Sequence, residues 1–110
     1  MTVYGGYRTM WVFAMFDLPT DTPAARKAYA DFRKQLLKDG FTMLQFSVYA
    51  RHCPSEENAG VHMERVKSYL PADGEVRLLT ITDAQFGRMQ VYHGRIRAAT
   101  ECAPEQVSFF

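Results

Sequence analysis

The chain has 110 residues, enough for a single domain with one hydrophobic core. Hydrophobic residues make up 47% of the sequence and aromatic residues 14%, which is typical of a globular protein and excludes a disordered chain. The formal net charge is +1, so affinity for nucleic acid cannot be argued from the total charge and would need basic residues that cluster. The two cysteines, Cys53 and Cys102, are too few for a disulfide framework or a zinc site.

The first residues, MTVYGGYRT, lack the long apolar segment of a signal peptide. No apolar run approaches the roughly 20 residues needed to cross a bilayer. We therefore expect a cytoplasmic protein without a membrane partner. Along the chain we expect an N-terminal extension over 1–9, one folded domain over 10–97 and a C-terminal tail over 98–110.

Residues 10–17, MWVFAMFD, predict a strand that is covered on both faces, because apolar side chains occupy both alternating sets of positions. A hydroxyl residue followed by proline, Thr22 and Pro23, is typical of a helix start. Gly40 is typical of a helix end. The sequence therefore predicts a helix over 23–39.

Residues 42–51, TMLQFSVYAR, alternate between apolar and polar positions and predict one half-buried strand. On this interpretation Gln45, Ser47 and Tyr49 lie on the open face of the sheet, and Tyr49 is buried with Trp11 in a dimer interface. The simpler element order is then β-α-β-α-β-β. The order β-α-β-β-α-β would require a turn or bulge within the segment.

A second helix is predicted from the N-cap Ser55 to Pro71, followed by a strand over 74–82, a turn over 83–87 and a strand over 88–94. The pattern favours an α+β fold: a ferredoxin-like sandwich whose antiparallel four-stranded sheet carries two helices on one face, with an additional C-terminal strand. Aromatic residues on the open sheet face would make that face a homodimer interface.

Three stretches together resemble one known family. FDLP ends the first strand, LQFSVYAR forms the second, and EVRLLTITDAQFGRMQVYHG gives a strand, a turn and a further strand. In this order they resemble Cas2, the small CRISPR-associated adaptation protein that is the second subunit of the spacer-integration complex. The resemblance is strongest to members that accompany single-effector CRISPR systems, and it covers roughly residues 10–95.

The resemblance implies a ferredoxin-like homodimer with one of two roles. In the first, the dimer is a scaffold that holds duplex DNA between integrase subunits, and the carboxylate at the end of the first strand is dispensable. In the second, the two such carboxylates of the dimer bind Mg²⁺ in an endonuclease that acts on RNA or DNA. Many members have Tyr before this carboxylate where this chain has Phe16, which favours the scaffold role.

Asp17 is the candidate catalytic and metal-binding residue. Judged without the resemblance, an Asp after a strand more often caps the following turn or helix. Asp17 shares a strand face with Trp11, Phe13 and Met15. The resemblance then implies that it meets Asp17 of the second protomer across the two-fold axis. A Mg²⁺ ion shared by the two carboxylates, or a shared proton, would relieve their repulsion. Asp83 opens the predicted turn and is assigned a structural role.

Arg26 and Lys27 lie in the first turn of the first helix, where cations oppose the helix dipole and a bound anion would explain them. Arg95 and Arg97 follow the last core strand. The resemblance implies duplex contacts in these two regions, so all four side chains are predicted to contact the nucleic-acid backbone without reading its sequence. The other basic residues of the helix are interpreted as a solvated face: Arg33, Lys34 and Lys38.

The tail ends in three apolar residues, Val107, Phe109 and Phe110. We interpret them as a docking strand that adds to a sheet edge, either on the dimer mate or on the integrase partner. The alternative is that the tail folds back on the core of its own chain.

The histidines at positions 52, 62 and 93 show no metal-ligand spacing, and His62 is expected at or near the surface. A plain ferredoxin-like dimerisation or ligand-binding module without nucleic-acid affinity stays as a third hypothesis beside the scaffold and the nuclease.

Overall fold

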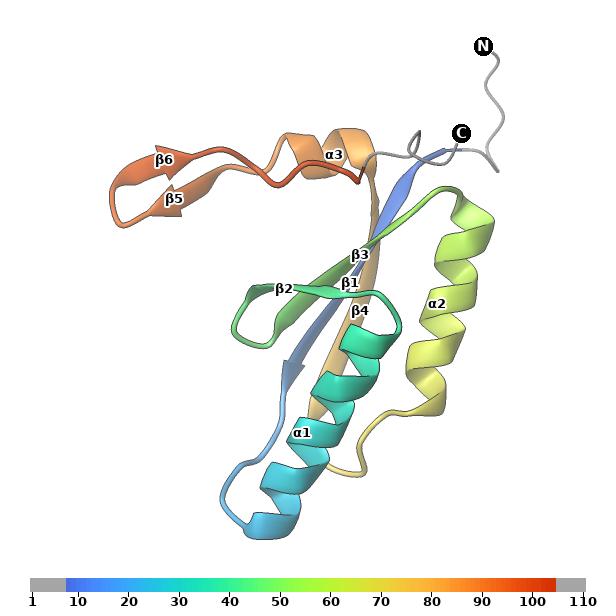
Figure 1. The fold of residues 1–110 in the computed structure, drawn as a ribbon, viewed down its shortest axis with the longest axis vertical. Helices are drawn as coiled ribbons and strands as arrows, with labels where there is room; N and C mark the ends of the chain where they lie inside the picture. The colour runs from blue at the N-terminus through green and yellow to red at the C-terminus, as the bar shows by residue number, and fades with distance from the viewer. Residues whose placement is uncertain (1–7, 105–110) are drawn as a thin grey trace.

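The structure, a computed structural model, describes residues 8–104. The elements in chain order are β1 (Met10–Asp17), α1 (Pro23–Lys38), β2 (Thr42–Gln45), β3 (Val48–Cys53), α2 (Glu56–Ser68), β4 (Glu75–Thr82), α3 (Asp83–Gly87), β5 (Val91–His93) and β6 (Ile96–Ala98). The first four strands form one antiparallel sheet in the order β2-β3-β1-β4, and β5 and β6 pair in a separate hairpin. Figure 1 shows α1 and α2 on the same side of the sheet, with the hairpin projecting away from it. This is the predicted ferredoxin-like α+β arrangement.

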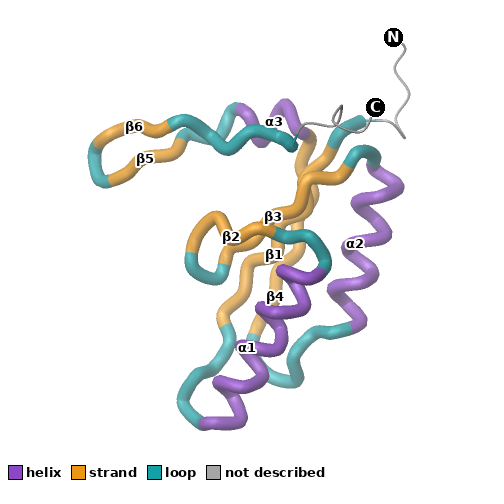
Figure 2. The backbone as a smooth tube through the Cα atoms, in the orientation of Figure 1, coloured by secondary structure: helices purple, strands orange, loops and turns teal. Residues whose placement is uncertain are grey.

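The strand β1 separates two hydrophobic clusters, as its two apolar faces predict. On the side of α1 and α2, Val12, Ala14 and Phe16 belong to the main core together with helix residues such as Phe32 and Val66. The opposite side, which we call the open face, carries a smaller cluster; its buried members are Trp11, Phe13, Ala50 and Phe86. Figure 2 shows α3 at one end of the sheet, away from the two long helices.

The two long helices begin where the sequence predicts. The hydroxyl of Thr22 accepts a hydrogen bond from the backbone N–H of Ala25 at 3.0 Å, and Ser55 caps α2 in the same way through Asn58. Each cap satisfies a backbone donor that the first turn of a helix leaves without a partner. The second helix ends at Ser68, before the predicted stop at Pro71.

The prediction of a single strand over 42–51 is wrong. The chain turns at Phe46 and Ser47, so the segment makes a hairpin of β2 and β3 and the order becomes β-α-β-β-α-β. Ser47 has a φ of 64°, a left-handed conformation that glycine or asparagine would have signalled. The predicted order β-α-β-α-β-β is wrong because the turn contains no glycine or asparagine, the residues that favour a left-handed conformation and would have indicated a hairpin.

The predicted faces of this segment are also reversed. Tyr49 is buried in the main core beneath the helices, whereas Leu44, Val48 and Ala50 contribute to the cluster on the open face. Alternation shows which residues share a face but not which face the helices cover. Trp11 is buried within its own chain and stacks on Phe86 at a centroid distance of 3.8 Å. Its burial therefore does not require a dimer interface.

The predicted turn over 83–87 is the short helix α3, which a capping box opens. Thr82 and Gln85 exchange hydrogen bonds between side chain and backbone at 3.0 and 2.8 Å. Of the predicted strand over 88–94, only Val91–His93 is extended, and it pairs with β6, which was not predicted. Within residues 8–104, no helix is both long enough and apolar enough to cross a bilayer.

Candidate nucleic-acid and metal-binding site

Asp17 is the last residue of β1 and its side chain is exposed. It follows the positions of β1 that face away from the long helices. Its register partner on β4 is Glu75, and directly paired residues of antiparallel strands share one face of a sheet. Glu75 forms an ion pair with Arg77 at 3.3 Å. Two carboxylates and one guanidinium therefore lie at this end of the sheet.

The backbone after Asp17 is packed closely against the loop that leads into β4. Gly74 has a φ of +93°, and a Cβ there would lie 2.8 Å from the carbonyl oxygen of Asp17 and 2.6 Å from the side chain of Leu18. Only glycine fits this position without displacing the end of β1. Gly74 thus lets this loop pack directly against the backbone of Asp17 and Leu18 and so helps to set the position of Asp17. This role was not assigned to it from the sequence.

The residue before Asp17 contributes nothing to this surface. Phe16 is buried on the helix side of β1, in ring contact with Phe32 and Tyr49. Adjacent residues of a strand point to opposite faces. The ring of Phe16 therefore belongs to the core, and the chemistry available at the exposed surface is that of the carboxylates.

The donor set suits Mg²⁺ only in part. This ion prefers carboxylate oxygens, keeps several waters and is often held by one or two carboxylates together with substrate phosphates. Asp17, with Glu75 beside it, supplies donors of that kind. In the described part of one chain, no three His, Cys, Asp or Glu side chains come together in a group that could hold a metal ion. A complete site would thus need a second chain or a phosphate ligand.

Arg26 and Lys27 lie in the exposed first turn of α1, which contains no acidic residue. The guanidinium of Arg26 donates to the carbonyl oxygen of Thr20 at 3.1 Å. The ammonium of Lys27 forms an ion pair with Asp31 at 2.9 Å, an i,i+4 contact on the same helix. Arg26 is therefore the better placed of the two for an anion, since part of the charge of Lys27 is already matched.

Arg95 and Arg97 belong to the hairpin of β5 and β6, which projects from the body of the protein (Figure 1). Both side chains are exposed, and neither forms an ion pair with another residue in the range 8–104. Arg97 is paired in register with Tyr92. Tyr92 and Ile96 are 51% and 75% exposed, so the hairpin presents apolar as well as basic side chains.

The structure does not bring the four predicted basic contacts together within one chain. The first turn of α1 and the β5–β6 hairpin lie toward opposite ends of the molecule in Figure 1. A ligand that reached both would need to be extended or to bind two copies. The predicted docking residues Val107, Phe109 and Phe110 lie outside the described residues.

Sequence reasoning missed a buried polar cluster between the two long helices. Asp39, the C-cap of α1, lies 3.0 Å from both His62 Nδ1 and Arg65 Nη1, and the Tyr69 hydroxyl donates to it at 3.4 Å. His62 is 3% exposed, contrary to its expected surface position. Burial lowers the pKa of His62, although its hydrogen bond to Asp39 opposes that shift. Burial and the nearby carboxylate together raise the pKa of Tyr69.

Asp83 has the structural role that was expected of it. Its side chain bonds to a residue far away in the sequence and not to the neighbouring backbone of a turn. Its carboxylate accepts a hydrogen bond from Trp11 Nε1 at 2.7 Å, and its backbone N–H donates to Thr9. These bonds hold α3 over the open face, where Phe86 covers the indole ring. The rings of His52 and Trp11 make a T-shaped contact at a centroid distance of 5.2 Å, and burial lowers the pKa of His52.

The fold and this surface define a class: a small ferredoxin-like α+β protein with a carboxylate at the end of β1 and an exposed basic hairpin that follows the four-stranded sheet in the chain. A family model described as "CRISPR associated protein Cas2" matches residues 10–89. The chain therefore belongs to the Cas2 family, which confirms the resemblance found in its motifs.

Several relatives are similar over nearly the whole chain. A "CRISPR-associated endoribonuclease Cas2" of Parvibaculum lavamentivorans is 65% identical over 101 residues, which are 92% of this chain and 100% of the relative. Proteins with the same description from Flavobacterium psychrophilum and Paracidovorax avenae are 45% and 46% identical. These matches cover 94% and 96% of this chain and 90% and 97% of the two relatives.

Proposed function

We propose that the protein is a CRISPR adaptation protein that works as a homodimeric scaffold. In this role it binds duplex DNA without sequence specificity, inside the integrase complex that acquires spacers. Membership of the Cas2 family supports the adaptation role. The observation that carries the scaffold proposal is the projecting hairpin with Arg95 and Arg97, two exposed guanidiniums without acidic partners in the described chain.

Guanidinium groups on a projecting hairpin are suited to bind the phosphates of a nucleic-acid backbone. Such contacts require positive charge that extends from the protein surface, and they do not require hydrogen bonds to the base edges. Arg26 adds a cation at a helix N-terminus, where anions are favoured. A homodimer would present each of these groups twice. That duplication would let one duplex lie across both copies, which a single chain cannot provide.

Two features of the sheet support dimer formation. The strand β4 has eight residues and lies at an edge of the sheet, so one row of its backbone groups has no strand partner in the described chain. The open face also carries partly exposed apolar side chains, among them Met15, Val48 and Leu79, and Leu79 is 48% exposed. A second copy would cover both features.

The test is duplex binding measured by fluorescence anisotropy over a series of salt concentrations, with two duplexes of unrelated sequence. We expect equal affinity for both duplexes, and a log–log salt slope that is shallower by about 0.9 for each phosphate that Arg95→Glu/Arg97→Glu no longer neutralises. The variant Lys34→Glu/Lys67→Glu makes the same change in net charge elsewhere and should bind nearly as the wild type does. Equal weakening by both variants would show that only net charge matters and would refute the hairpin's role.

The second candidate function is a Mg²⁺-dependent endonuclease that acts on RNA or DNA. It is favoured by the exposed carboxylate of Asp17 beside Glu75, and by the description of the relatives as endoribonucleases. The Asp17 residues of two copies would hold the ion across the dimer axis. Bound Mg²⁺ would supply an activated water for attack on a phosphodiester. Cleavage that requires both Mg²⁺ and Asp17 would establish this function.

A further inference from the structure

Phe46 is the most exposed large hydrophobic side chain among the described residues, at 79%. It lies in the turn between β2 and β3, and β2 is at the edge of the sheet opposite β4. Its ring stacks on that of Tyr29 of α1 at a centroid distance of 6.0 Å, with 23° between the ring planes. Because α1 covers the side of the sheet opposite the open face, Phe46 lies on the helix side of the turn (Figure 1).

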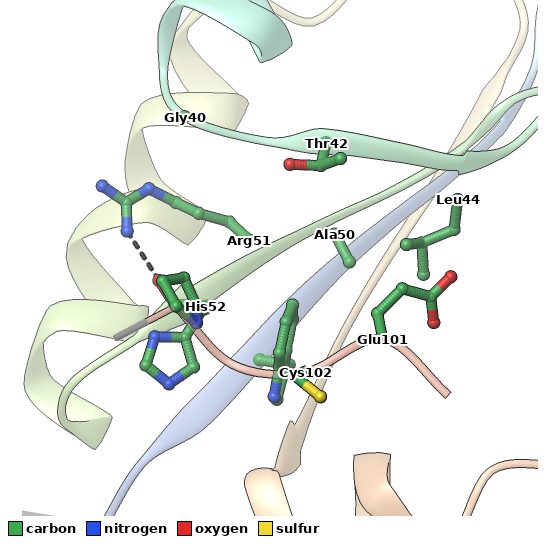
Figure 3. A pocket seen from close by; sticks show the side chains of 10 residues that line it. Gly40, Thr42, Leu44, Ala50, Arg51, His52, Glu101 and Cys102 are labelled. Atoms are coloured by element: carbon green, nitrogen blue, oxygen red, sulfur yellow. Dashed lines mark hydrogen bonds between the residues drawn. The ribbon is translucent and has the colours of Figure 1, made fainter. Parts of the chain in front are cut away.

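This position keeps Phe46 clear of the proposed dimer contacts. A second copy would cover the edge of β4 and the open face. The groove of about 480 Å³ on that face, which Leu44, Ala50 and Cys102 help to line, would then lie beneath the second copy (Figure 3). Phe46 lies at the other edge of the sheet, beside α1. Its ring therefore remains accessible in the homodimer.

The turn holds the ring of Phe46 outward through Ser47, whose backbone is left-handed with a φ of 64°. The carbonyl oxygen of Ser47 accepts a hydrogen bond from the backbone N–H of Phe16 at 3.1 Å. The Ser47 hydroxyl bonds to the hydroxyl of Tyr29, also at 3.1 Å. A left-handed conformation is uncommon for a residue other than glycine and persists where surrounding contacts impose it. The turn is thus tied to both β1 and α1, and it presents Phe46 to solvent in a fixed position.

Positive charge lies on both sides of this ring pair. Arg26, Tyr29 and Arg33 are spaced three and four positions apart, so their side chains lie along one face of α1. Arg26 and Arg33 are about 10 Å apart along the helix axis, with Tyr29 between them. Both are exposed, and neither forms an ion pair within residues 8–104. Arg26 donates to the carbonyl oxygen of Thr20 and retains further donors for an anion.

We propose that Phe46 is a stacking platform for an unpaired base of a single-stranded nucleic acid, with Arg26 and Arg33 on the phosphates of the adjoining nucleotides. Proteins that bind single strands combine aromatic rings, on which bases stack, with cations that follow the backbone. An apolar side chain of a protein partner would cover Phe46 but would leave both guanidiniums without a counter-charge. A nucleotide supplies a flat apolar base and an anion together.

The proposal rests on nucleic-acid binding, which both candidate functions require, and adds a single-stranded segment to what the protein holds. It gives Arg33 a ligand in place of the solvated face predicted from the sequence. The site selects unpaired bases, because a base inside a duplex has its two faces covered by its neighbours in the stack.

The test measures binding of a labelled thymidine or uridine oligonucleotide of about twelve nucleotides by fluorescence anisotropy. An abasic DNA counterpart of the same length has the same phosphates and no bases. We expect Phe46→Ser to weaken binding of the oligonucleotides with bases about 5- to 150-fold, the effect of losing one base–aromatic stack. Binding of the abasic strand should be unchanged. Equal affinity of the wild type and Phe46→Ser for the strands with bases would overturn the proposal.

Two further substitutions separate stacking from an apolar contact. Phe46→Tyr keeps an aromatic ring and should bind as the wild type does, whereas Phe46→Leu keeps only the apolar character and should be weakened like Phe46→Ser. Tight binding by Phe46→Leu would contradict stacking. The matched control Val61→Ser removes a side chain that is 46% exposed on α2 and should have no effect. A Phe46→Ser protein that sediments as a monomer where the wild type is a dimer would assign the ring to a contact between copies and would contradict the proposal.

The charges are tested by Arg33→Glu and Lys34→Glu, which make the same change in net charge at adjacent positions of α1. Only Arg33 shares the helix face of Tyr29. We expect Arg33→Glu to make the log–log salt slope for the single strand shallower by about 0.7 for each phosphate that is no longer neutralised, and Lys34→Glu to leave it nearly unchanged. Equal slopes in the two variants would contradict the role of Arg33.

A blunt duplex measured beside the single strands distinguishes this proposal from the scaffold function. Phe46→Ser should bind the duplex as the wild type does. Equal weakening on the duplex and the single strands would overturn the stacking of an unpaired base. A wild-type protein that binds the single strands through Phe46 but does not bind the duplex would support the stacking site and refute the scaffold function.

Discussion

Removal of the carboxylate of Asp39 should lower the free energy of unfolding strongly, because it serves partners from α2 and from the end of that helix. Its side chain is 7% exposed and serves three partners, of which His62 is 4% exposed at its side chain and Arg65 is 59% exposed. In Asp39→Ala the buried imidazole and the Tyr69 hydroxyl both lose their acceptor. Each buried polar group left without a partner costs about 1–3 kcal/mol, whereas the exposed pair with Arg65 adds about 0–1 kcal/mol.

We therefore expect Asp39→Ala to lower the free energy of unfolding by about 3–5 kcal/mol, which lies within the range of about 2–7 kcal/mol that these losses give together. For a domain of this size the melting temperature should fall by roughly 12 °C or more. The assay is urea unfolding followed by the fluorescence of Trp11, which is the only tryptophan of the chain.

The control for this prediction is Asp31→Ala, which removes the exposed partner of Lys27 and should cost less than about 0.5 kcal/mol. A loss below about 1 kcal/mol in Asp39→Ala, with an unchanged dependence on denaturant, would refute the reasoning. It would mean that water replaces the carboxylate at no cost and that the cluster does not hold α1 against α2.

Three further changes have expected directions. Burial lowers the pKa of His62 in the folded protein below its ordinary value of 6.5. As the pH falls below 6.5, the unfolded chain therefore takes up a proton before the folded chain does. The contribution of His62 to the free energy of unfolding is complete above pH 6.5 and decreases as the pH falls toward the pKa of the folded state. Urea unfolding at a series of pH values should show this slope, and a slope that is no smaller in His62→Gln would contradict the assignment. Gly74→Ala should lose about 1–3 kcal/mol, since its Cβ would collide with the end of β1. Gly60→Ala, whose Cβ meets nothing within 4 Å on α2, should gain about 0.5–1 kcal/mol, and thermal melts that give both changes the same sign would refute the contrast. Asp83→Ala leaves the indole N–H of Trp11 without its acceptor and should cost about 1–3 kcal/mol, accompanied by a shift in the emission of that tryptophan, whereas Asp83→Asn should retain most of the stability.

The sequence was sufficient where local chemistry decides the structure. Thr22 with Pro23, and Ser55 with the acids that follow it, carry their own capping chemistry, so both helix starts were predicted correctly. The two-sided apolar pattern of residues 10–17 likewise predicted a strand with a core on each side. It also placed Asp17 at the end of that strand, on the same strand face as Trp11 and Phe13, which lie on the open face.

The sequence was insufficient where the structure depends on tertiary packing. Ser47 adopts a left-handed conformation without a glycine or asparagine signal, so the pattern predicted one strand where β2 and β3 form a hairpin. The capping box of Thr82 and Gln85 was readable, but a helix of five residues is too short for a periodic apolar pattern. The contact of Asp39 with His62 spans 23 positions and exists only once the two long helices pack on one face.

The measurement that tests the central claim most directly compares pure wild-type protein with Asp17→Asn on labelled duplex DNA and RNA, with Mg²⁺ or EDTA. Binding and cleavage are read from the same samples at low and moderate salt. The scaffold account predicts tight, salt-sensitive duplex binding that is equal in the two proteins, with no cleavage in either. Cleavage by the wild type that requires Mg²⁺ and disappears in Asp17→Asn would contradict that account, and would place phosphodiester chemistry at the carboxylates at the end of β1.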